Sequence, residues 1–263
     1  MRAAIRLYGR LLKASWQSVL QYRFSFIASV IFQTLVTVSD FLVVLTILYR
    51  TKSVGGWSAA QIGVIYGITS ISSAMFRVFG CELHMFQNYI IRGEYDGILL
   101  RPWPSLLVLL GRKVEFFRLG GVLQGLTALL ISLHYLGGIA SLGWMYGYLL
   151  LMPICGTVIF FSISIATAAC AFWFGRVRDL QTLTYYAANY AASYPTSIYP
   201  VWLRGLLTLL PVSFIGYLPA RFALGLGGSP WDLLLPWLAA VASLYLALRF
   251  WRVGEAAYHS SGS

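Results

Sequence analysis

The stretch FSFIASVIFQTLVTVSDFLVVLTIL, Phe24–Leu48, has one charged residue, Asp40, in 25 positions. An α-helix rises about 1.5 Å per residue, so this stretch is long enough to cross a hydrocarbon core of about 30 Å. The whole chain has the same character, because 59% of its 263 residues are hydrophobic and only 10% are charged. Soluble domains average about 25% charged residues. The composition therefore indicates an all-α integral membrane protein and not a soluble enzyme.

Six apolar segments have the length of a membrane span. The sequence predicts transmembrane helices at residues 24–49, 58–79, 117–136, 144–174, 180–197 and 231–251. Residues 198–230 are also apolar, but four prolines and several glycines interrupt them. We expect a re-entrant helical hairpin there, which dips into the outer leaflet and is tolerated because protein surrounds it.

The basic residues predict the orientation of these spans. Fifteen of the 19 Lys and Arg residues fall in segments that we assign to the cytoplasm: 1–23, 77–118, 175–183 and 249–263. This positive-inside bias predicts that both ends of the chain are cytoplasmic. It also accounts for the net charge of +11, so we expect no nucleic-acid partner. Residues 1–23 place their apolar side chains mostly on one helical face, which predicts an amphipathic helix at the interface with membrane lipids.

Catalytic and metal-binding motifs are missing from the sequence. It contains no G-x-x-x-x-G-K-[ST] phosphate loop, no H-E-x-x-H zinc motif and no G-x-S-x-G elbow. The three histidines are far apart, and the three cysteines form no C-x-x-C pair. We therefore expect no catalytic residue, metal or bound cofactor in this chain.

The most specific segment is RGEYDGILLRPWPS, Arg92–Ser105, in the predicted cytoplasmic region 80–116. Two glycines flank a short acidic piece, and an apolar patch follows it. Pro102 and Pro104 end any helix and force extended backbone before a new helix begins near Ser105. We expect a short cytoplasmic helix between these glycines and prolines, with acidic and exposed apolar side chains. Such a helix is compatible with a protein-docking element, which would couple the chain to a partner, and with an amphipathic connector that rests on lipid headgroups.

The sequence resembles the permease subunits of bacterial type-2 ABC (ATP-binding cassette) exporters, in the branch whose chains are about this length. The first matching stretch is RGEYDGILLRP, Arg92–Pro102. The second is the pattern Y-P…W-L-R…L-L-P…F-I-G-Y-L-P-A within Tyr194–Ala220, and the third is the tail YHSSGS, Tyr258–Ser263. The resemblance covers essentially the whole chain.

The resemblance implies that residues 1–263 form a single transmembrane domain in the bacterial inner membrane. It implies that this domain is half of an export pathway for a lipophilic or amphipathic molecule such as a drug, a lipid or a glycan. The other half is a second permease, identical or different. Two copies of a cytoplasmic ABC ATPase bind ATP and Mg²⁺ and drive spans one, two and five. Residues 252–263 become a cytoplasmic tail.

The resemblance also assigns roles to individual residues. Those expected to couple to the ATPase are Arg92, Gly93, Glu94, Tyr95, Asp96, Gly97, Leu99, Leu100 and Arg101. Those expected in the re-entrant extracellular gate are Pro200, Arg204, Pro211, Tyr217, Pro219 and Arg221. Candidates for lining the pathway are Phe32, Gln33, Asp40, Phe41, Tyr66, Tyr186 and Tyr190, although an interfacial belt or simple packing also explains such aromatics.

Asp40 lies within the first predicted span, where a carboxylate costs about 2.5–3.5 kcal/mol on insertion scales and normally has a partner. We expect it either to pair with Arg204 or Arg221 or to face a cationic substrate.

Small residues four apart predict close helix contacts. These pairs are Gly63–Gly67, Gly121–Gly125, Gly143–Gly147, Ala187–Ala191 and Ala188–Ala192. The alanines of the fifth span are the expected contact with the second permease.

Two other classes of protein stay open on the residues alone. An ion-driven carrier predicts several charged residues within the spans and an internal repeat. An intramembrane enzyme predicts a cluster of polar groups in the spans. The sequence shows one intramembrane carboxylate, no repeat and no such cluster.

Overall fold

The computed structural model describes residues 53–138 and 142–259, together with isolated positions between residues 17 and 46. The predicted interfacial helix 1–23 is described at one position, and the first predicted span 24–49 is described at less than half of its positions. Gln33, Asp40 and Phe41 lie outside the described residues, so their predicted roles stay predictions.

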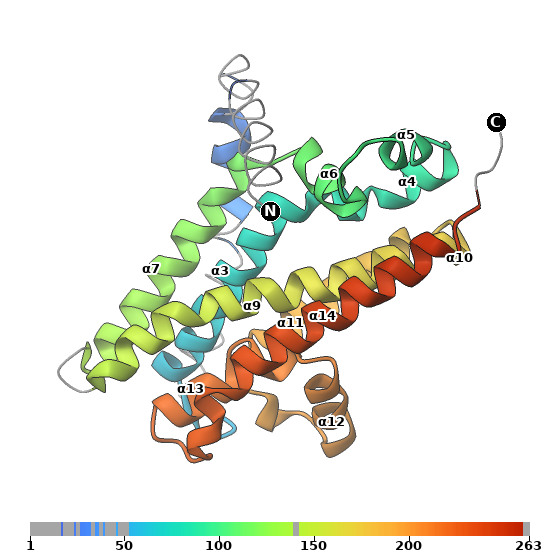
Figure 1. The fold of residues 1–263 in the computed structure, drawn as a ribbon. Helices are drawn as coiled ribbons and strands as arrows, with labels where there is room; N and C mark the ends of the chain where they lie inside the picture. Colours follow the sequence, from blue (N-terminus) through green and yellow to red (C-terminus); the bar gives the residue numbers. More distant parts are fainter. Residues whose placement is uncertain are drawn as a thin grey trace.

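The described chain is built from helices, with one two-stranded antiparallel hairpin near its start (Figure 1). The hairpin joins β1 (Ser53–Val54) and β2 (Trp57–Ser58) through Gly55 and Gly56, both at positive φ. The long helices are α3 (Ala59–His84), α7 (Leu119–Tyr135), α9 (Trp144–Ala169), α11 (Arg178–Ala192) and α14 (Leu235–Ala256). The short helices are α4 (Phe86–Ile91), α5 (Asp96–Leu99), α6 (Ser105–Arg112), α10 (Ala171–Phe174), α12 (Val201–Leu209) and α13 (Tyr217–Ala223). Short 3₁₀ turns lie at Phe116–Arg118, Thr196–Ile198, Val212–Phe214 and Pro230–Leu233.

The prediction of six membrane spans is confirmed in part. Within the described residues, three helical stretches are long and apolar enough to cross a membrane: Ala59–Ile91, Phe116–Tyr135 and Trp144–Phe174. A fourth is added if the bent pair Val201–Leu209 and Val212–Ala223 counts as one span. These limits agree closely with the predicted spans 117–136 and 144–174. The helix predicted to end at residue 79 instead continues beyond Arg77 and Glu82 to His84.

The other two predicted spans, 180–197 and 231–251, are not among these stretches. Helix α11 has 15 residues, so it rises only about 22 Å, which is less than the thickness of a hydrocarbon core. Helix α14 has 22 residues, but its last turns carry Arg249, Arg252 and Glu255, which shortens its uniformly apolar part.

Helices α3 and α7 approach each other closely because glycines lie at their crossing. A Cβ atom on Gly63 would meet the Ser132 hydroxyl at 2.1 Å, and one on Gly67 would meet the Leu129 backbone at 2.8 Å. From the opposite helix, a Cβ on Gly125 would meet the backbone nitrogen of Ile71 at 2.8 Å. The predicted close contacts of Gly63–Gly67 and Gly121–Gly125 are therefore confirmed, and these two pairs face the same interface.

Helices α9 and α14 run side by side across the molecule, and α11 lies against α9 and α3 (Figure 1). Ala188 and Ala192 of α11 are buried, and the carbonyl of Ala192 accepts a hydrogen bond from Thr69 at 2.9 Å. This pair of alanines therefore packs inside the chain and is not available to a second permease. Ala187, on the outer side of the same helix, remains exposed.

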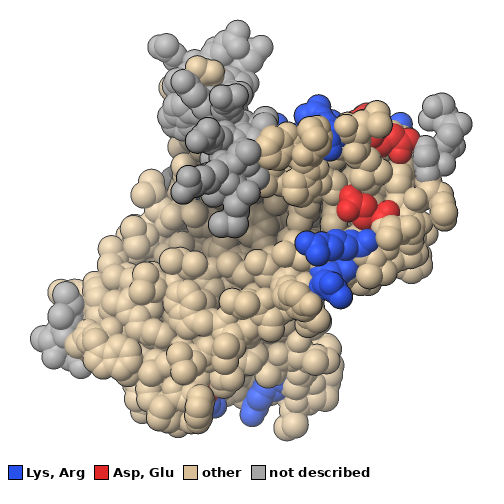
Figure 2. Space-filling view, in the orientation of Figure 1, with Lys and Arg blue, Asp and Glu red and all other residues tan. Residues whose placement is uncertain are grey.

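Charged side chains are concentrated at one end of the molecule. On the visible face, blue and red side chains gather mainly around α4, α5, α6 and the last turns of α14, while most of the surface is uncharged (Figure 2). Helix α13 lies at the other end of α14, and α12 lies to one side of α14 (Figure 1). We call the region around α4, α5, α6 and the last turns of α14 the docking end, and the region of α12 and α13 the hairpin end.

Candidate functional site

The docking segment, Arg92–Arg101, follows α4 and begins with a sharp turn. Gly93 adopts a φ of +68°, a conformation that glycine accepts at little cost, and its N–H bonds to the carbonyl of Ile90 at 3.2 Å. The N–H of Tyr95 then bonds to the carbonyl of Tyr89 at 3.1 Å. The short helix expected here is a single turn, α5, and the next helix begins at Ser105 after Pro104, as the prolines predicted.

The docking segment has an inner and an outer side. On the inner side, Tyr95 and Ile98 are completely buried. On the outer side, Leu99 is 42% and Leu100 is 87% exposed. The charged pair of Arg92 and Glu94, 3.8 Å apart, is also exposed. The outer side thus offers adjacent apolar and charged groups to a partner. Tyr95, which was expected among the coupling residues, lies beneath this surface and not on it.

The ring of Tyr95 sits in a cluster of aromatic side chains from three other parts of the chain. Its centroid lies 5.3 Å from that of Phe86, 5.4 Å from Phe172 and 5.2 Å from Tyr258. Trp251 of α14 completes the cluster, 4.7 Å from Phe86. Edge-to-face aromatic pairs of this kind contribute about 0.5–1.5 kcal/mol each beyond their buried area. The cluster therefore holds the docking segment firmly against α4, α10 and α14.

Two contacts between a tyrosine and a carboxylate connect the docking segment to the end of α14. In the first contact the tyrosine belongs to the docking segment, and in the second the carboxylate does. The hydroxyl of Tyr95 donates a hydrogen bond to Glu255 Oε1 at 2.6 Å, from the docking segment to α14. Tyr258, just beyond α14, lies beside Asp96 of the docking segment. Burial and the bond to Glu255 raise the pKa of Tyr95, and burial and the Asp96 carboxylate raise the pKa of Tyr258, so both phenols stay protonated at neutral pH. We call Tyr95, Asp96, Glu255 and Tyr258 the clamp.

Glu255 and Tyr258 were missed as site residues in the sequence. Their signal was weak: a lone carboxylate at the end of an apolar helix, 160 positions from its partner.

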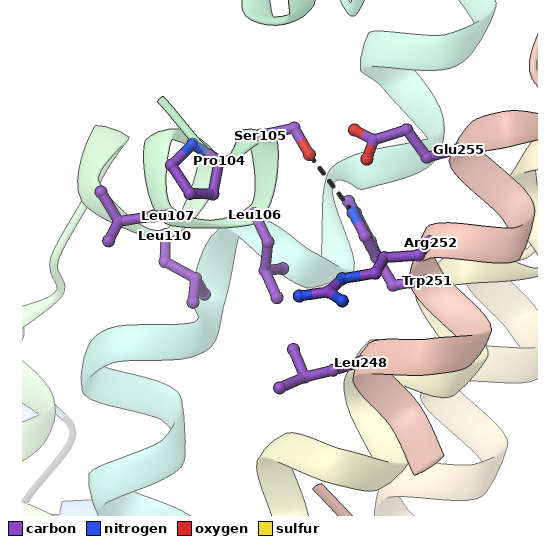
Figure 3. A pocket seen from close by; sticks show the side chains of 9 residues that line it. All are labelled: Pro104, Ser105, Leu106, Leu107, Leu110, Leu248, Trp251, Arg252 and Glu255. Atoms are coloured by element: carbon purple, nitrogen blue, oxygen red, sulfur yellow. Dashed lines mark hydrogen bonds between the residues drawn. The ribbon is translucent and has the colours of Figure 1, made fainter. Parts of the chain in front are cut away.

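A groove of about 390 Å³ lies next to the clamp, between α6 and the end of α14 (Figure 3). Leu106 and Leu110 approach it from α6, and Leu248 approaches it from α14 (Figure 3). The indole N–H of Trp251 donates to Ser105 Oγ at 3.3 Å across its inner edge. These contacts join the start of α6 to α14, so both ends of the segment 92–105 are attached to the last helix.

The residues predicted for the gate lie at the hairpin end. Pro200 and Pro211 stand directly before α12 and the 3₁₀ turn Val212–Phe214, and the two helical stretches there are bent by 79°. Tyr217 and Pro219 are buried. The bend is compatible with the predicted re-entrant hairpin and also with a single broken span.

Both arginines proposed as partners of Asp40 have contacts within the hairpin end. Arg221 pairs with the buried carboxylate of Asp232 at 2.6 Å. The guanidinium of Arg204 donates to the carbonyl oxygens of Ser197 and Tyr199 at 2.9 and 3.3 Å.

Four of the candidate pathway residues are described: Phe32, Tyr66, Tyr186 and Tyr190. Tyr66 is buried between α3 and α7, where its hydroxyl accepts a hydrogen bond from Gln124 at 3.2 Å. Tyr186 and Tyr190 are exposed on α11 with stacked rings 6.4 Å apart, and Phe32 is exposed as well.

A family model described as ABC-2 family transporter protein matches residues 34–262, which include the docking segment, the hairpin end and the clamp. No curated protein sequence matches the chain. Its apolar helices and this match identify a multi-pass membrane protein that is a transport component. The chain belongs to the ABC-2 family of transporter proteins.

Proposed function

We propose that this chain is the permease of an ATP-driven exporter in the bacterial inner membrane. It forms half of a translocation pathway with a second permease, identical or different, and works with two copies of a separate ABC ATPase. Its cargo is a lipophilic or amphipathic molecule, such as a drug, a lipid or a glycan. Membership of the ABC-2 family supports the coarse assignment.

The observation that carries the coupling role is the two-sided docking segment. An exposed leucine such as Leu100 is unfavourable in water, but beside Arg92 and Glu94 it forms the mixed surface typical of a protein interface. A docking element must also transmit a push, which requires rigidity. The buried ring of Tyr95 provides that rigidity, because moving Leu100 relative to α14 would disrupt the aromatic cluster.

The clamp also indicates where the push goes. The sequence led us to expect movement of spans one, two and five. In the structure the docking segment continues directly from α3 and α4, which agrees with the second span, but its side-chain contacts run to α10 and α14. We therefore propose that closure of the ATPase moves α14, whose opposite end connects to the hairpin end (Figure 1).

The first test uses an exposed leucine at each end of the molecule. The chain is co-expressed with its ABC ATPase, and both association and ATP hydrolysis are measured. Leu100→Gln should reduce association and abolish permease-dependent stimulation. Leu209→Gln, at a leucine that is 81% exposed on α12, should leave both unchanged. Equal behaviour of the two variants would refute the docking assignment.

The second test separates an ATP-driven exporter from an ion-driven carrier. The purified chain is reconstituted alone in liposomes with a fluorescent amphipathic cation. Uphill movement of this probe under an ion gradient, without ATPase or nucleotide, would overturn the proposed function.

A further inference from the structure

A second pocket, of about 290 Å³, lies between α3, the segment 113–118 and α11. Four cationic side chains from separate parts of the chain line it. They are Arg77 of α3, Lys113 between α6 and the following 3₁₀ turn, Arg118 at the start of α7, and Arg178 at the start of α11. Tyr185 and Tyr186 form part of its wall.

The pocket holds more positive than negative charge. Its two carboxylates are Glu82 and Glu115. Glu115 pairs with Lys113 at 2.9 Å and with Arg118. Burial alone would raise the pKa of Glu115, but hydrogen bonds from Arg118 and Lys113 outweigh burial and lower it, so Glu115 is ionised at neutral pH. Four cations thus face two carboxylates.

Two of the four cations have no ion-pair partner among residues 53–138 and 142–259. These are Arg77 and Arg178. The Nε–H of Arg77 is buried and finds no hydrogen-bond acceptor in that part of the chain. An unsatisfied buried donor costs about 1–3 kcal/mol, and native proteins normally supply an acceptor for it. The pocket therefore has donors and charge prepared for an anion from outside the described chain.

A phosphate group matches this arrangement. Its oxygens accept charge-assisted hydrogen bonds from guanidinium and ammonium groups, and arginine binds it through a planar fork of donors. The volume is close to the lower end of small-molecule sites, about 300 Å³, which suits a headgroup and not a whole lipid. Many of the basic residues that predict the cytoplasmic side lie in this part of the chain, which is where phospholipid headgroups contact a membrane protein.

We propose that this pocket binds the phosphate group of an anionic molecule, either a phospholipid headgroup at the cytoplasmic surface or a soluble phosphate compound. The site is separate from the docking segment and needs neither ATP nor the ATPase. Its failure would leave the proposed exporter role intact, and failure of the exporter role would leave this site intact.

The test measures binding to the purified full-length protein in detergent by calorimetry. One arm uses dihexanoyl phosphatidylglycerol with dihexanoyl phosphatidylcholine as its zwitterionic control, and the other arm uses inorganic phosphate. Preference for phosphatidylglycerol over phosphate identifies a lipid headgroup site, and comparable binding of phosphate identifies a soluble ligand. Binding of neither probe would overturn the proposal.

Three variants locate the site. Arg178→Gln, at an exposed residue whose loss does not endanger folding, should weaken binding at least tenfold, and Arg77→Gln should do the same. Glu115→Gln should strengthen binding severalfold, because it releases Lys113 and Arg118. The matched control is Arg176→Gln, which removes the same charge two positions from Arg178 but does not line the pocket. Equal losses in Arg176→Gln and Arg178→Gln would show general surface attraction and refute the site.

Discussion

Replacing Gly67 with alanine should separate the two helices that carry the α3–α7 interface. The new Cβ would lie 2.7 Å from Leu129 Cβ and 2.8 Å from the Cα and nitrogen of Leu129. Carbon atoms in contact are normally about 3.5–4.0 Å apart, so the helices must part by about 1 Å. Backbone atoms cannot rotate away as a flexible side chain can, and the clash is therefore not relieved locally.

The expected cost follows from two opposing terms. Overpacking costs about 1–3 kcal/mol, and a clash with backbone belongs at the upper end of that range. Alanine recovers about 1 kcal/mol of helix propensity relative to glycine. The net destabilisation is about 2 kcal/mol, which corresponds to a fall of roughly 4–8 °C in the unfolding midpoint of a chain of this size.

The assay is thermal unfolding of the purified protein in detergent, with Gly147→Ala as the matched control. Gly147 belongs to another G-x-x-x-G pair, but a Cβ there meets nothing within 4 Å. The control should melt at the wild-type temperature or slightly higher. A Gly67→Ala protein that melts no lower than Gly147→Ala would refute the reasoning.

Three further predictions concern polar contacts. Tyr95→Phe keeps the aromatic ring but removes the 2.6 Å bond to Glu255, so ATPase stimulation should fall while the free energy of unfolding drops by only about 1.5 kcal/mol. Tyr95→Ala should abolish ATPase stimulation and also strongly destabilise the fold. Arg221→Gln leaves the buried carboxylate of Asp232 unpaired and should lower the free energy of unfolding by about 3 kcal/mol. Adding Asp232→Asn should restore part of the thermal unfolding midpoint, and no recovery in the double variant would argue against the pair. The pKa of Glu115 lies below its ordinary value of 4.5, so its ion pairs stabilise the fold fully above pH 4.5 and this stabilisation is lost as the pH falls through the lowered pKa. The difference in thermal unfolding midpoint between wild type and Glu115→Gln should therefore be smaller at pH 4 than at pH 7.

Local properties of the sequence determined much of this protein. Hydropathy predicted the limits of the helical stretches Phe116–Tyr135 and Trp144–Phe174 within one residue, because the cost of placing a side chain in lipid depends little on distant parts of the chain. The positions of Pro102 and Pro104 likewise predicted the start of α6, since proline restricts its own backbone and that of the residue before it.

Only the tertiary structure decided which of these local features are used. Three G-x-x-x-G pairs look alike in the sequence, yet two face another backbone and the third faces open space. Tyr95 reads as a surface residue between two charged neighbours, yet it is buried and bonded to Glu255, 160 positions away. A single sequence contains no record of contacts between distant segments, because their energies arise only when folding brings the segments together.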